Sequence, residues 1–385
     1  MSDYKKYICQ KPWVEAQIMP NGQVYSCCPA WTNGYTFGNL NENSMHDVWN
    51  GEKAQIFRKS ILDGSYKYCN EKSCPLLQNK ENALGKRYGY TGFTWPETIE
   101  DVKEEKTVLS HGPLHFELCY DESCNLACPS CRSNIKYATG NERVVIDNFH
   151  EQIMKNIKST KMIGVDAAGE ALASVTFRNF LINLKKEDAP ELTGILLLTN
   201  GLLIKKYWNE LSEYSREKIK NLGISVSIDA TTKSVYEIVR RPGKFENLIE
   251  NLEFIRDHIK PNFFAVSTVI QKENYRELID FIDFAKKYNC NHLQYQILEP
   301  DTRIGSDPLY FYIWKSQAVH EKTHPLHLDF IDYVNKINLN QDNLTINFGP
   351  LLNLKRGIDI SQLETVESEH KKIWKVNDGN SELIL

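Results

Sequence analysis

The stretch Cys124-Asn125-Leu126-Ala127-Cys128-Pro129-Ser130-Cys131 carries three thiols separated by three and then two intervening residues. An apolar, strand-like run, Leu114 to Cys119, comes directly before it. Three thiolates can hold one metal centre, but a tetrahedral zinc site or a four-iron cluster needs four ligands. A structural zinc site normally supplies a fourth cysteine or histidine, whereas a site with an open position is usually catalytic. The triad therefore indicates a metal centre with one position left open.

The spacing of these cysteines resembles the signature of the radical S-adenosylmethionine (radical SAM) superfamily, which lies in a loop after the first barrel strand. The resemblance implies that Cys124, Cys128 and Cys131 each bind one iron of a [4Fe–4S] cluster whose fourth iron binds SAM. It also implies reductive cleavage of SAM to a 5′-deoxyadenosyl radical, and a reducing partner such as flavodoxin or ferredoxin. Ser130 stands where relatives often carry an aromatic residue. The alternatives for the three thiols are a zinc knuckle and buried structural cysteines.

Composition narrows the class of protein. The 385 residues suffice for two domains, or for one barrel with an appendage. The net charge of −4, without a long basic run, argues against a nucleic-acid substrate, because phosphate binding needs a concentrated basic face. There is no apolar run of roughly 18 residues, so no membrane span is predicted. The first residues lack the apolar core of a signal peptide, so we expect a cytoplasmic protein, in which ten cysteines indicate metal binding or catalysis rather than disulfides.

The N-terminal segment reads as a hairpin followed by a helix. Residues 20–23, Pro-Asn-Gly-Gln, form a strong turn signal between the strand-like runs 14–18 and 24–27. A helix is predicted from Ser44, which can cap it, to Gly64, because apolar residues recur between them at helical spacing.

Four cysteines frame this unit, which is too small to hold much core of its own: Cys9, Cys27, Cys69 and Cys74. A metal centre would stabilise it. The segment resembles the SPASM/twitch auxiliary-cluster domain, through the position of Gly22 between the first two cysteines and the element Phe37-Gly38-Asn39-Leu40. The resemblance implies that the four cysteines bind a second, auxiliary [4Fe–4S] cluster. Cys28 is a possible substitute ligand, and zinc is the alternative metal. In many relatives this domain follows the barrel, whereas here it precedes it.

Strand and helix signals then alternate, as in a parallel βα fold. The six expected strands are Leu114–Cys119, Met162–Asp166, Ile195–Leu198, Ile224–Ile228, Phe263–Val269 and Leu293–Leu298. Six such units match the open barrel of radical SAM enzymes. In these barrels, chemistry takes place at the carboxyl ends of the strands.

We therefore expect an α/β fold with four parts. Its centre is a partial (β/α)6 TIM-like barrel over residues 113–298. A small N-terminal cysteine-rich hairpin-helix domain covers residues 1–80, and a connector covers 81–112. Residues 299–385 form a C-terminal capping extension.

Polar residues follow the second and third of these strands, where relatives bind SAM. Residues 168–170, Ala-Gly-Glu, resemble the Gly-Gly-Glu element of the family, with alanine replacing the first glycine. The resemblance implies that Gly169 and Glu170 hold the SAM amino group, since an ammonium needs an acceptor. A plain helix N-terminus is the alternative reading. Thr199 and Asn200 occupy a turn that faces SAM or its ribose in relatives.

The fourth strand and the helix after it supply further candidates. Ser227 and Asp229 share a strand face, so both can point into the barrel. The segment 236–243 resembles the one whose arginine pairs with the SAM carboxylate, for which a guanidinium is suited. The resemblance assigns this role to Arg240, with Arg241 as the second candidate.

The substrate is the least readable part of the sequence. Cys119 shares a strand face with Glu117, so it could donate a hydrogen atom to a substrate radical; a buried core cysteine is the alternative. The resemblance implies an auxiliary cluster that assists oxidation or modification of a peptide, a protein or a small carbohydrate-like molecule, and the sequence does not decide among them. The competing class is a non-catalytic zinc or iron–sulfur binding module.

Overall fold

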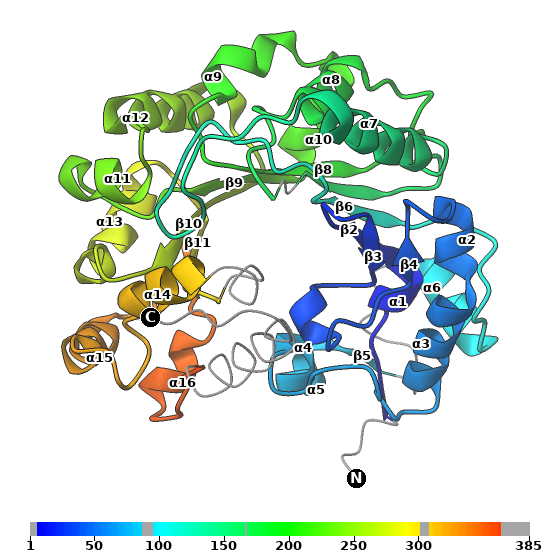
Figure 1. The fold of residues 1–385 in the computed structure, drawn as a ribbon, viewed down its shortest axis with the longest axis horizontal. Coiled ribbons are helices and arrows are strands. Elements are labelled where there is room, and N and C mark those ends of the chain that lie inside the picture. Colours follow the sequence, from blue (N-terminus) through cyan, green and yellow to red (C-terminus); the bar gives the residue numbers. More distant parts are fainter. Residues whose placement is uncertain (1–5, 87–94, 166–167, 301–307, 363–385) are drawn as a thin grey trace, which may run out of the picture. The chain divides into compact units, whose positions relative to one another are not determined.

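The computed structural model of the chain describes residues 6–86, 95–165, 168–300 and 308–362. The chain forms two compact units, whose elements are labelled in Figure 1. The first contains Met1–Cys124, Tyr137–Leu198 and Tyr207–Leu222. The second contains the remaining residues, namely Asn125–Lys136, Thr199–Lys206 and Gly223–Leu385. The chain therefore passes from the first unit to the second within the cysteine stretch, directly after Cys124.

The first unit begins with the cysteine-rich elements: β1 (Tyr7–Ile8), α1 (Lys11–Val14), β2 (Glu15–Ile18), β3 (Gln23–Tyr25), a 3-10 turn (Pro29–Trp31), β4 (Gly38–Asn39), α2 (Met45–Asn50), α3 (Glu52–Leu62), α4 (Pro75–Gln78), α5 (Lys80–Ala83) and β5 (Gly85–Lys86). The elements that follow are α6 (Pro96–Lys103), β6 (His115–Leu118), α7 (Gly140–Met154), β7 (Met162–Val165), α8 (Val175–Asn183), β8 (Gly194–Thr199), a 3-10 turn (Trp208–Glu210) and α10 (Glu213–Asn221).

The hairpin and the barrel strands of this unit belong to one sheet. Its strand order is β8-β7-β6-β2-β3-β4. β2 runs parallel to β6, with Glu15 opposite His115 and Ile18 opposite Leu118, and β3 and β4 continue antiparallel. The expected hairpin is thus present as β2 and β3, and it extends the sheet of the barrel strands (Figure 1). As a result, the cysteine-rich segment lies directly beside the first barrel strand.

One face of β6 packs against the helices α7 and α8. Phe116 is fully buried, and Tyr120, just beyond the strand, packs edge-on against Phe149 of α7 and Phe177 of α8. Because successive residues of a strand point to opposite faces, the odd-numbered residues point away from these helices. The face that they form, here called the His115 face, carries His115, Glu117 and, directly after the strand, Cys119.

The helix expected from Ser44 to Gly64 forms as two pieces, α2 and α3. The hydroxyl of Ser44 accepts a hydrogen bond from the backbone N–H of Asp47 at 3.2 Å, which confirms the predicted cap. Gly51 lies between the two pieces in an extended conformation, with a ψ of 168°, and this conformation interrupts the helix.

A buried arginine on α3 holds the segment before β6. Nε of Arg58 donates to the carbonyl of Pro12 at 2.9 Å, and its Nη1 donates to the carbonyl of Thr107 at 2.7 Å. The guanidinium carbon lies 4.7 Å from the ring centre of Trp49, a cation–π distance. Burial lowers the pKa of Arg58 to about 9, although the charge of Asp101 partly offsets this effect. The guanidinium therefore ties three separate stretches of the chain together.

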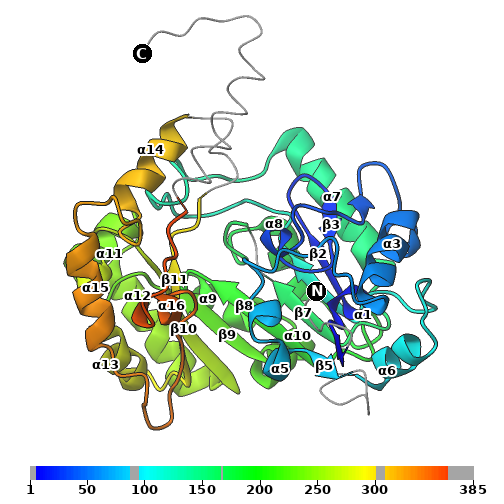
Figure 2. The same cartoon turned by 90° about the horizontal axis from the view of Figure 1, so that it is seen from below.

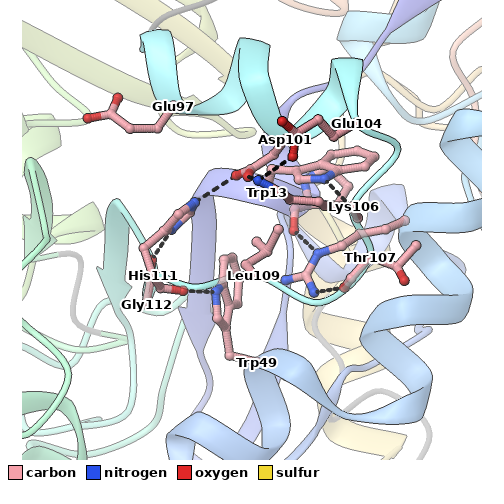
Figure 3. Close-up of polar contacts among 12 residues, drawn as sticks. Trp13, Trp49, Glu97, Asp101, Glu104, Lys106, Thr107, Leu109, His111 and Gly112 are labelled. Atoms are coloured by element: carbon pink, nitrogen blue, oxygen red, sulfur yellow. Dashed lines mark hydrogen bonds and ion pairs between the residues drawn. The ribbon is translucent and has the colours of Figure 1, made fainter.

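The surrounding contacts are drawn in Figure 3. The indoles of Trp13 and Trp49 donate hydrogen bonds to the carbonyls of Lys106, at 2.9 Å, and of His111, at 3.0 Å. Nε2 of His111 lies 2.8 Å from a carboxylate oxygen of Asp101. Side-chain donors thus bond to backbone carbonyls of residues 106–111, which belong to no strand. These bonds fix the path of the chain into β6.

The Arg58→Lys substitution is expected to lower the free energy of unfolding by about 2–4 kcal/mol, because one ammonium cannot replace a fork that reaches two carbonyls. Denaturant titration followed by tryptophan fluorescence measures the change, since Trp13 and Trp49 lie in this network. Lys53→Arg, on the exposed side of α3, is the matched control and should change stability by less than about 0.5 kcal/mol. A change of that small size for Arg58→Lys would show that the fork contributes little.

The second unit contains α9 (Ile204–Tyr207), whose last residue belongs to the first unit, then β9 (Gly223–Ser227), α11 (Lys233–Val239), α12 (Phe245–Phe254), a π-helical turn (Ile255–Ile259), β10 (Phe263–Ile270), a 3-10 turn (Tyr275–Glu277), α13 (Asp280–Lys287), β11 (His292–Ile297), α14 (Pro308–Gln317), α15 (His327–Lys336), β12 (Thr345–Asn347) and α16 (Leu351–Lys355). Its strands follow the order β12-β11-β10-β9, and all neighbours are parallel. The C-terminal extension therefore adds a strand to the sheet, with α16 beside β11 (Figure 2).

The six strands expected from the sequence are present as β6 to β11, each followed by helical structure. This confirms the α/β class, with mostly parallel strands, that was expected of a partial (β/α)6 barrel. Parts of the predicted connector (87–94) and of the predicted extension (301–307 and 363–385) lie outside the described residues. Within the described ranges, no helix has the length and apolar character needed to cross a bilayer.

Candidate functional site

The cysteine stretch packs against the residues that follow α11. Cys124 and Cys128 are buried, and Cys131 is half-buried. Within the second unit, the backbone N–H of Ala127 donates to the carbonyl of Arg241 at 2.7 Å, and Nε of Arg241 donates back to the carbonyl of Ala127 at 3.1 Å. These reciprocal bonds hold the middle of the cysteine loop in place.

Two predicted residues in the second unit form a buried ion pair. Nε of Arg240 lies 2.8 Å from a carboxylate oxygen of Asp229, in a geometry that departs from a regular hydrogen bond. The other carboxylate oxygen of Asp229 accepts from the backbone N–H of Val269 at 2.7 Å. Burial lowers the pKa of Arg240, but the charges of Asp229 and then of Cys128 outweigh it and raise the pKa above the usual arginine value. Asp229 thus orients Arg240 near the thiol of Cys128.

The other predicted residues of this unit line the same strand ends. Nδ2 of Asn200 donates to Oδ1 of Asn125, the residue after Cys124, at 2.8 Å. Oγ1 of Thr199 accepts from the backbone N–H of Gly201 at 3.0 Å, so its hydroxyl oxygen shapes the turn. Oγ of Ser227 lies 3.2 Å from Oγ of Ser267 on the neighbouring strand β10. The structure therefore brings Asn200 to the cysteine loop and places Ser227 along the sheet.

In the first unit, the loop after β7 touches the residue before Cys124. The backbone N–H of Glu170 donates to the carbonyl of Ser123 at 2.7 Å. A β-carbon built on Gly169 would lie 2.2 Å from that carbonyl oxygen, so only glycine permits this approach. Glu170 is buried, and its Oε1 accepts from the backbone N–H of Leu172 at 3.2 Å.

The charges of the four cysteines predicted for the auxiliary site act on one another. Cys9 interacts with Cys74, Cys27 with Cys9, and Cys69 with both Cys9 and Cys74. Burial is the main cause that raises the pKa of Cys9 to about 11, and it also raises the pKa of Cys27 and of Cys69. Four neighbouring thiols form a donor set suited to a [4Fe–4S] cluster.

Across the described part of the chain, no three side chains among His, Cys, Asp and Glu make a group that could hold one metal ion. Cys28 is half-buried beside Cys27, and its possible role as a substitute ligand stays a prediction.

A row of charged side chains connects the auxiliary thiols to the His115 face of β6. The ammonium of Lys11 contacts the carboxylate of Glu15. A carboxylate oxygen of Glu15 lies 3.4 Å from Nδ1 of His115, and Nε2 of His115 lies 2.9 Å from a carboxylate oxygen of Glu117. A β-carbon built on Gly164 of β7 would lie 1.8 Å from a carboxylate oxygen of Glu117, so Glu117 in its present position rests directly against Gly164.

Cys119 lies at the end of this row. Nε2 of Gln17 on β2 donates to its sulfur at 3.5 Å, and the thiol is buried. The row was not predicted from the sequence, apart from Glu117 and Cys119. The sequence does carry a signal for this row, because polar residues at every second position are unusual in a parallel strand that is buried on both faces.

The row predicts a pH dependence of stability. Burial lowers the pKa of His115, but the hydrogen bonds and charges of Glu117 and Glu15 outweigh this effect and raise the pKa to about 9. Because an unfolded histidine has a pKa of about 6.5, the contribution of protonated His115 is complete below about pH 6.5 and is lost as the pH rises through about 9. The free energy of unfolding should fall by on the order of 3 kcal/mol over this interval.

Denaturant titrations at pH 6.5 and pH 9.5 measure this loss. The His115→Gln variant should lose most of the dependence, whereas His46→Gln, at an exposed position of α2, should keep it. Equal pH dependence in the wild type and in His115→Gln would contradict the assignment.

A cleft of about 370 Å³ lies elsewhere in the first unit, between α7 and α8. Its lining includes Arg143, Asp147, His150 and Asn179. Nδ1 of His150 bonds to the hydroxyl of Tyr120 at 2.8 Å, and burial lowers the pKa of His150 to about 4. None of the predicted site residues lines this cleft.

Comparison with known proteins gives two family matches. Residues 9–75 match the iron-sulfur cluster-binding domain SPASM, and residues 122–285 match the radical SAM superfamily. The two matched segments contain all seven cysteines predicted as ligands.

Individual proteins and solved structures resemble parts of the chain. A GTP 3′,8-cyclase of Petrotoga mobilis is 25% identical over 174 residues, which are 44% of this chain and 51% of that protein. The chain spans about half the length of the curated relatives it matches. The crystal structure of Streptococcus suis SuiB bound to precursor peptide SuiA aligns with a TM-score of 0.42 and 14% identity, covering 83% of this chain and 70% of that one. Native anSMEcpe with bound AdoMet and a peptide aligns with a TM-score of 0.40 and 19% identity, covering 65% and 68%.

Proposed function

The chain belongs to the radical SAM superfamily and carries a SPASM domain ahead of its radical SAM domain, and we propose that it is an enzyme that abstracts hydrogen from a polar substrate. The radical SAM domain implies SAM and a [4Fe–4S] cluster, and the SPASM domain implies further iron–sulfur binding. When bound together, SAM and a reduced [4Fe–4S] cluster supply a 5′-deoxyadenosyl radical. The domain limits 1–80, 81–112, 113–298 and 299–385 are part of this proposal.

The observation that carries the proposal is the contact between the loop after β7 and the residue before Cys124. The missing side chain at Gly169 lets the backbone of Glu170 bond to Ser123 at 2.7 Å. We assign Gly169 and Glu170 to the amino group of SAM, because an ammonium beside the cysteines needs a buried acceptor.

The residues of the second unit have distinct parts in the proposed site. Cys128 and Cys131 bind the cluster together with Cys124. Arg240, oriented by Asp229, binds the carboxylate of SAM, because a guanidinium can face a carboxylate through several N–H groups. Arg241 bonds to the cysteine loop and is therefore better placed to hold that loop than to hold SAM.

Three further polar residues complete the SAM site in this proposal. Asn200 joins the turn after β8 to the cysteine loop through Asn125, and Thr199 shapes that turn. Ser227 lies on β9 beside Ser267. We assign all three to the polar surface that faces SAM.

The substrate lies, in this proposal, against the His115 face of β6. The amide of Gln17, the carboxylate of Glu117 and the thiol of Cys119 offer hydrogen-bonding groups there, so the surface suits a peptide or a small carbohydrate-like molecule. Cys119 is the candidate hydrogen donor. The auxiliary centre at Cys9, Cys27, Cys69 and Cys74 takes up an electron or binds the substrate. A small redox protein such as flavodoxin or ferredoxin supplies the reducing electron.

Anaerobic reconstitution tests the proposed function. The full chain should bind about eight irons, as two four-iron clusters, and should form 5′-deoxyadenosine from SAM when dithionite is added. A protein that takes up zinc alone and leaves SAM intact would instead support a non-catalytic binding module.

A further inference from the structure

Lys11 is the cation nearest the auxiliary thiols in the row described above. It lies two residues after Cys9, at the start of α1. Its ammonium interacts with both Cys9 and Cys27. The ammonium also lies 5.9 Å from the ring centre of Trp31, which follows Cys28 by three residues.

The position of this ammonium is fixed by its partner. Glu15 contacts Lys11, and only 6% of the Glu15 side chain is exposed to solvent. Glu15 also faces His115, which in turn faces Glu117. Because β2 pairs in register with β6, this arrangement is set by the sheet and does not depend on a surface loop. A salt bridge held in this way is screened much less than one in solvent.

The ion pair joins a half-buried lysine to a buried carboxylate that already has His115 as a second partner, so packing alone does not require a lysine at position 11. Burying an ion pair often costs more than the pair returns, and an apolar pair of similar size would pack equally well between a helix and a strand. The thiolates of the auxiliary site gain from a fixed cation, because they become strongly negative when they bind a cluster. Charge and hydrogen bonding around the sulfurs are among the factors that set the potential of such a cluster.

We propose that Lys11, positioned by Glu15, is a residue that raises the reduction potential of the auxiliary cluster. This inference rests on the proposed function, because it requires a cluster at Cys9, Cys27, Cys69 and Cys74. A cation near the sulfurs favours the reduced cluster, which carries one more negative charge, and Glu15 opposes it at a greater distance. The pair would thereby make the auxiliary centre a better acceptor for an electron from the substrate.

The test measures the potential of the auxiliary cluster in the full chain with Cys124, Cys128 and Cys131 changed to alanine, so that one cluster remains. EPR-monitored redox titration follows the reduced cluster. Lys11→Met should lower the ratio of reduced to oxidised cluster at a fixed potential about tenfold, which is a shift of about 59 mV to more negative values for a one-electron couple. Lys11→Arg should keep the potential of the parent, and Glu15→Gln should shift it in the opposite direction.

The outcomes are separable. Lys59→Met, at an exposed position of α3, is the control and should leave the potential unchanged. Unchanged potentials in both Lys11→Met and Lys11→Gln, with about four irons still bound, would overturn the role of Lys11 and leave the proposed function standing. If the parent with three alanines bound no iron at all, the proposed auxiliary site itself would fail.

Discussion

Replacing Cys128 with alanine is expected to abolish the formation of 5′-deoxyadenosine while about four of eight irons remain bound. The loss should be complete because Cys128 is the central thiol of the triad, and a cluster with only two protein ligands cannot keep its open iron for SAM. Iron analysis and chromatography of the SAM cleavage products after reconstitution measure both quantities.

Two further variants serve as comparisons for Cys128→Ala. Cys69→Ala removes a ligand of the proposed auxiliary site, so it should also leave about four irons but should keep cleavage of SAM. Cys290→Ala changes a buried thiol outside both groups and should leave both quantities at the wild-type level. Abolished SAM cleavage in a folded Cys69→Ala protein would contradict the division of the cysteines between two clusters.

The Arg240→Gln variant is expected to bind SAM at least about tenfold more weakly. Hydrogen bonds between charged groups contribute about 1.5–3 kcal/mol, and glutamine offers neither the charge nor the fork of a guanidinium. The dissociation constant is measured by anaerobic equilibrium dialysis of the reconstituted protein with labelled SAM.

The neighbouring Arg241 supplies the matched control. Its side chain bonds to the carbonyl of Ala127, so Arg241→Gln should change the dissociation constant of SAM by less than Arg240→Gln does. Iron content and thermal unfolding should be measured for both variants. In Arg240→Gln, the carboxylate of Asp229 loses its cation and keeps the backbone N–H of Val269 as its described partner, so stability has to be checked separately. If the affinity for SAM stayed within twofold of wild type in a loaded Arg240→Gln protein, Arg240 would not bind its carboxylate.

Much of the fold follows from local sequence patterns. The strands β6 to β11 are short runs of branched and aromatic residues separated by helical periods, and such patterns depend on near neighbours alone. Ser44 illustrates the same point at one residue, since a hydroxyl directly before an apolar helix caps it through a contact only three residues away. The break at Gly51 was missed, because helical spacing of apolar residues continues across it.

The candidate site was predicted in part. The cysteines, Glu170 and Arg240 stand out because their residue types and spacing match the chemistry of a cluster and of SAM. Lys11, Glu15 and His115 could not be found from the sequence in the same way. His115 lies about a hundred residues after the other two, and it meets Glu15 only through the register of β2 with β6. The ion pair of Asp229 with Arg240 was likewise unpredicted, since both residues had been assigned to SAM directly.

The sequence by itself determined the stretch Cys124 to Cys131, the second group of cysteines and the order of strands and helices, because each of these depends on spacing along the chain. Only the tertiary structure decided that the cysteine-rich hairpin joins the sheet of the barrel strands, that Gly169 lets the loop after β7 reach Ser123, and that four charged side chains link the auxiliary thiols to β6. The physical reason is that strand pairing and burial bring together residues with no relation in sequence, and a charge inside a protein is governed by its neighbours in space.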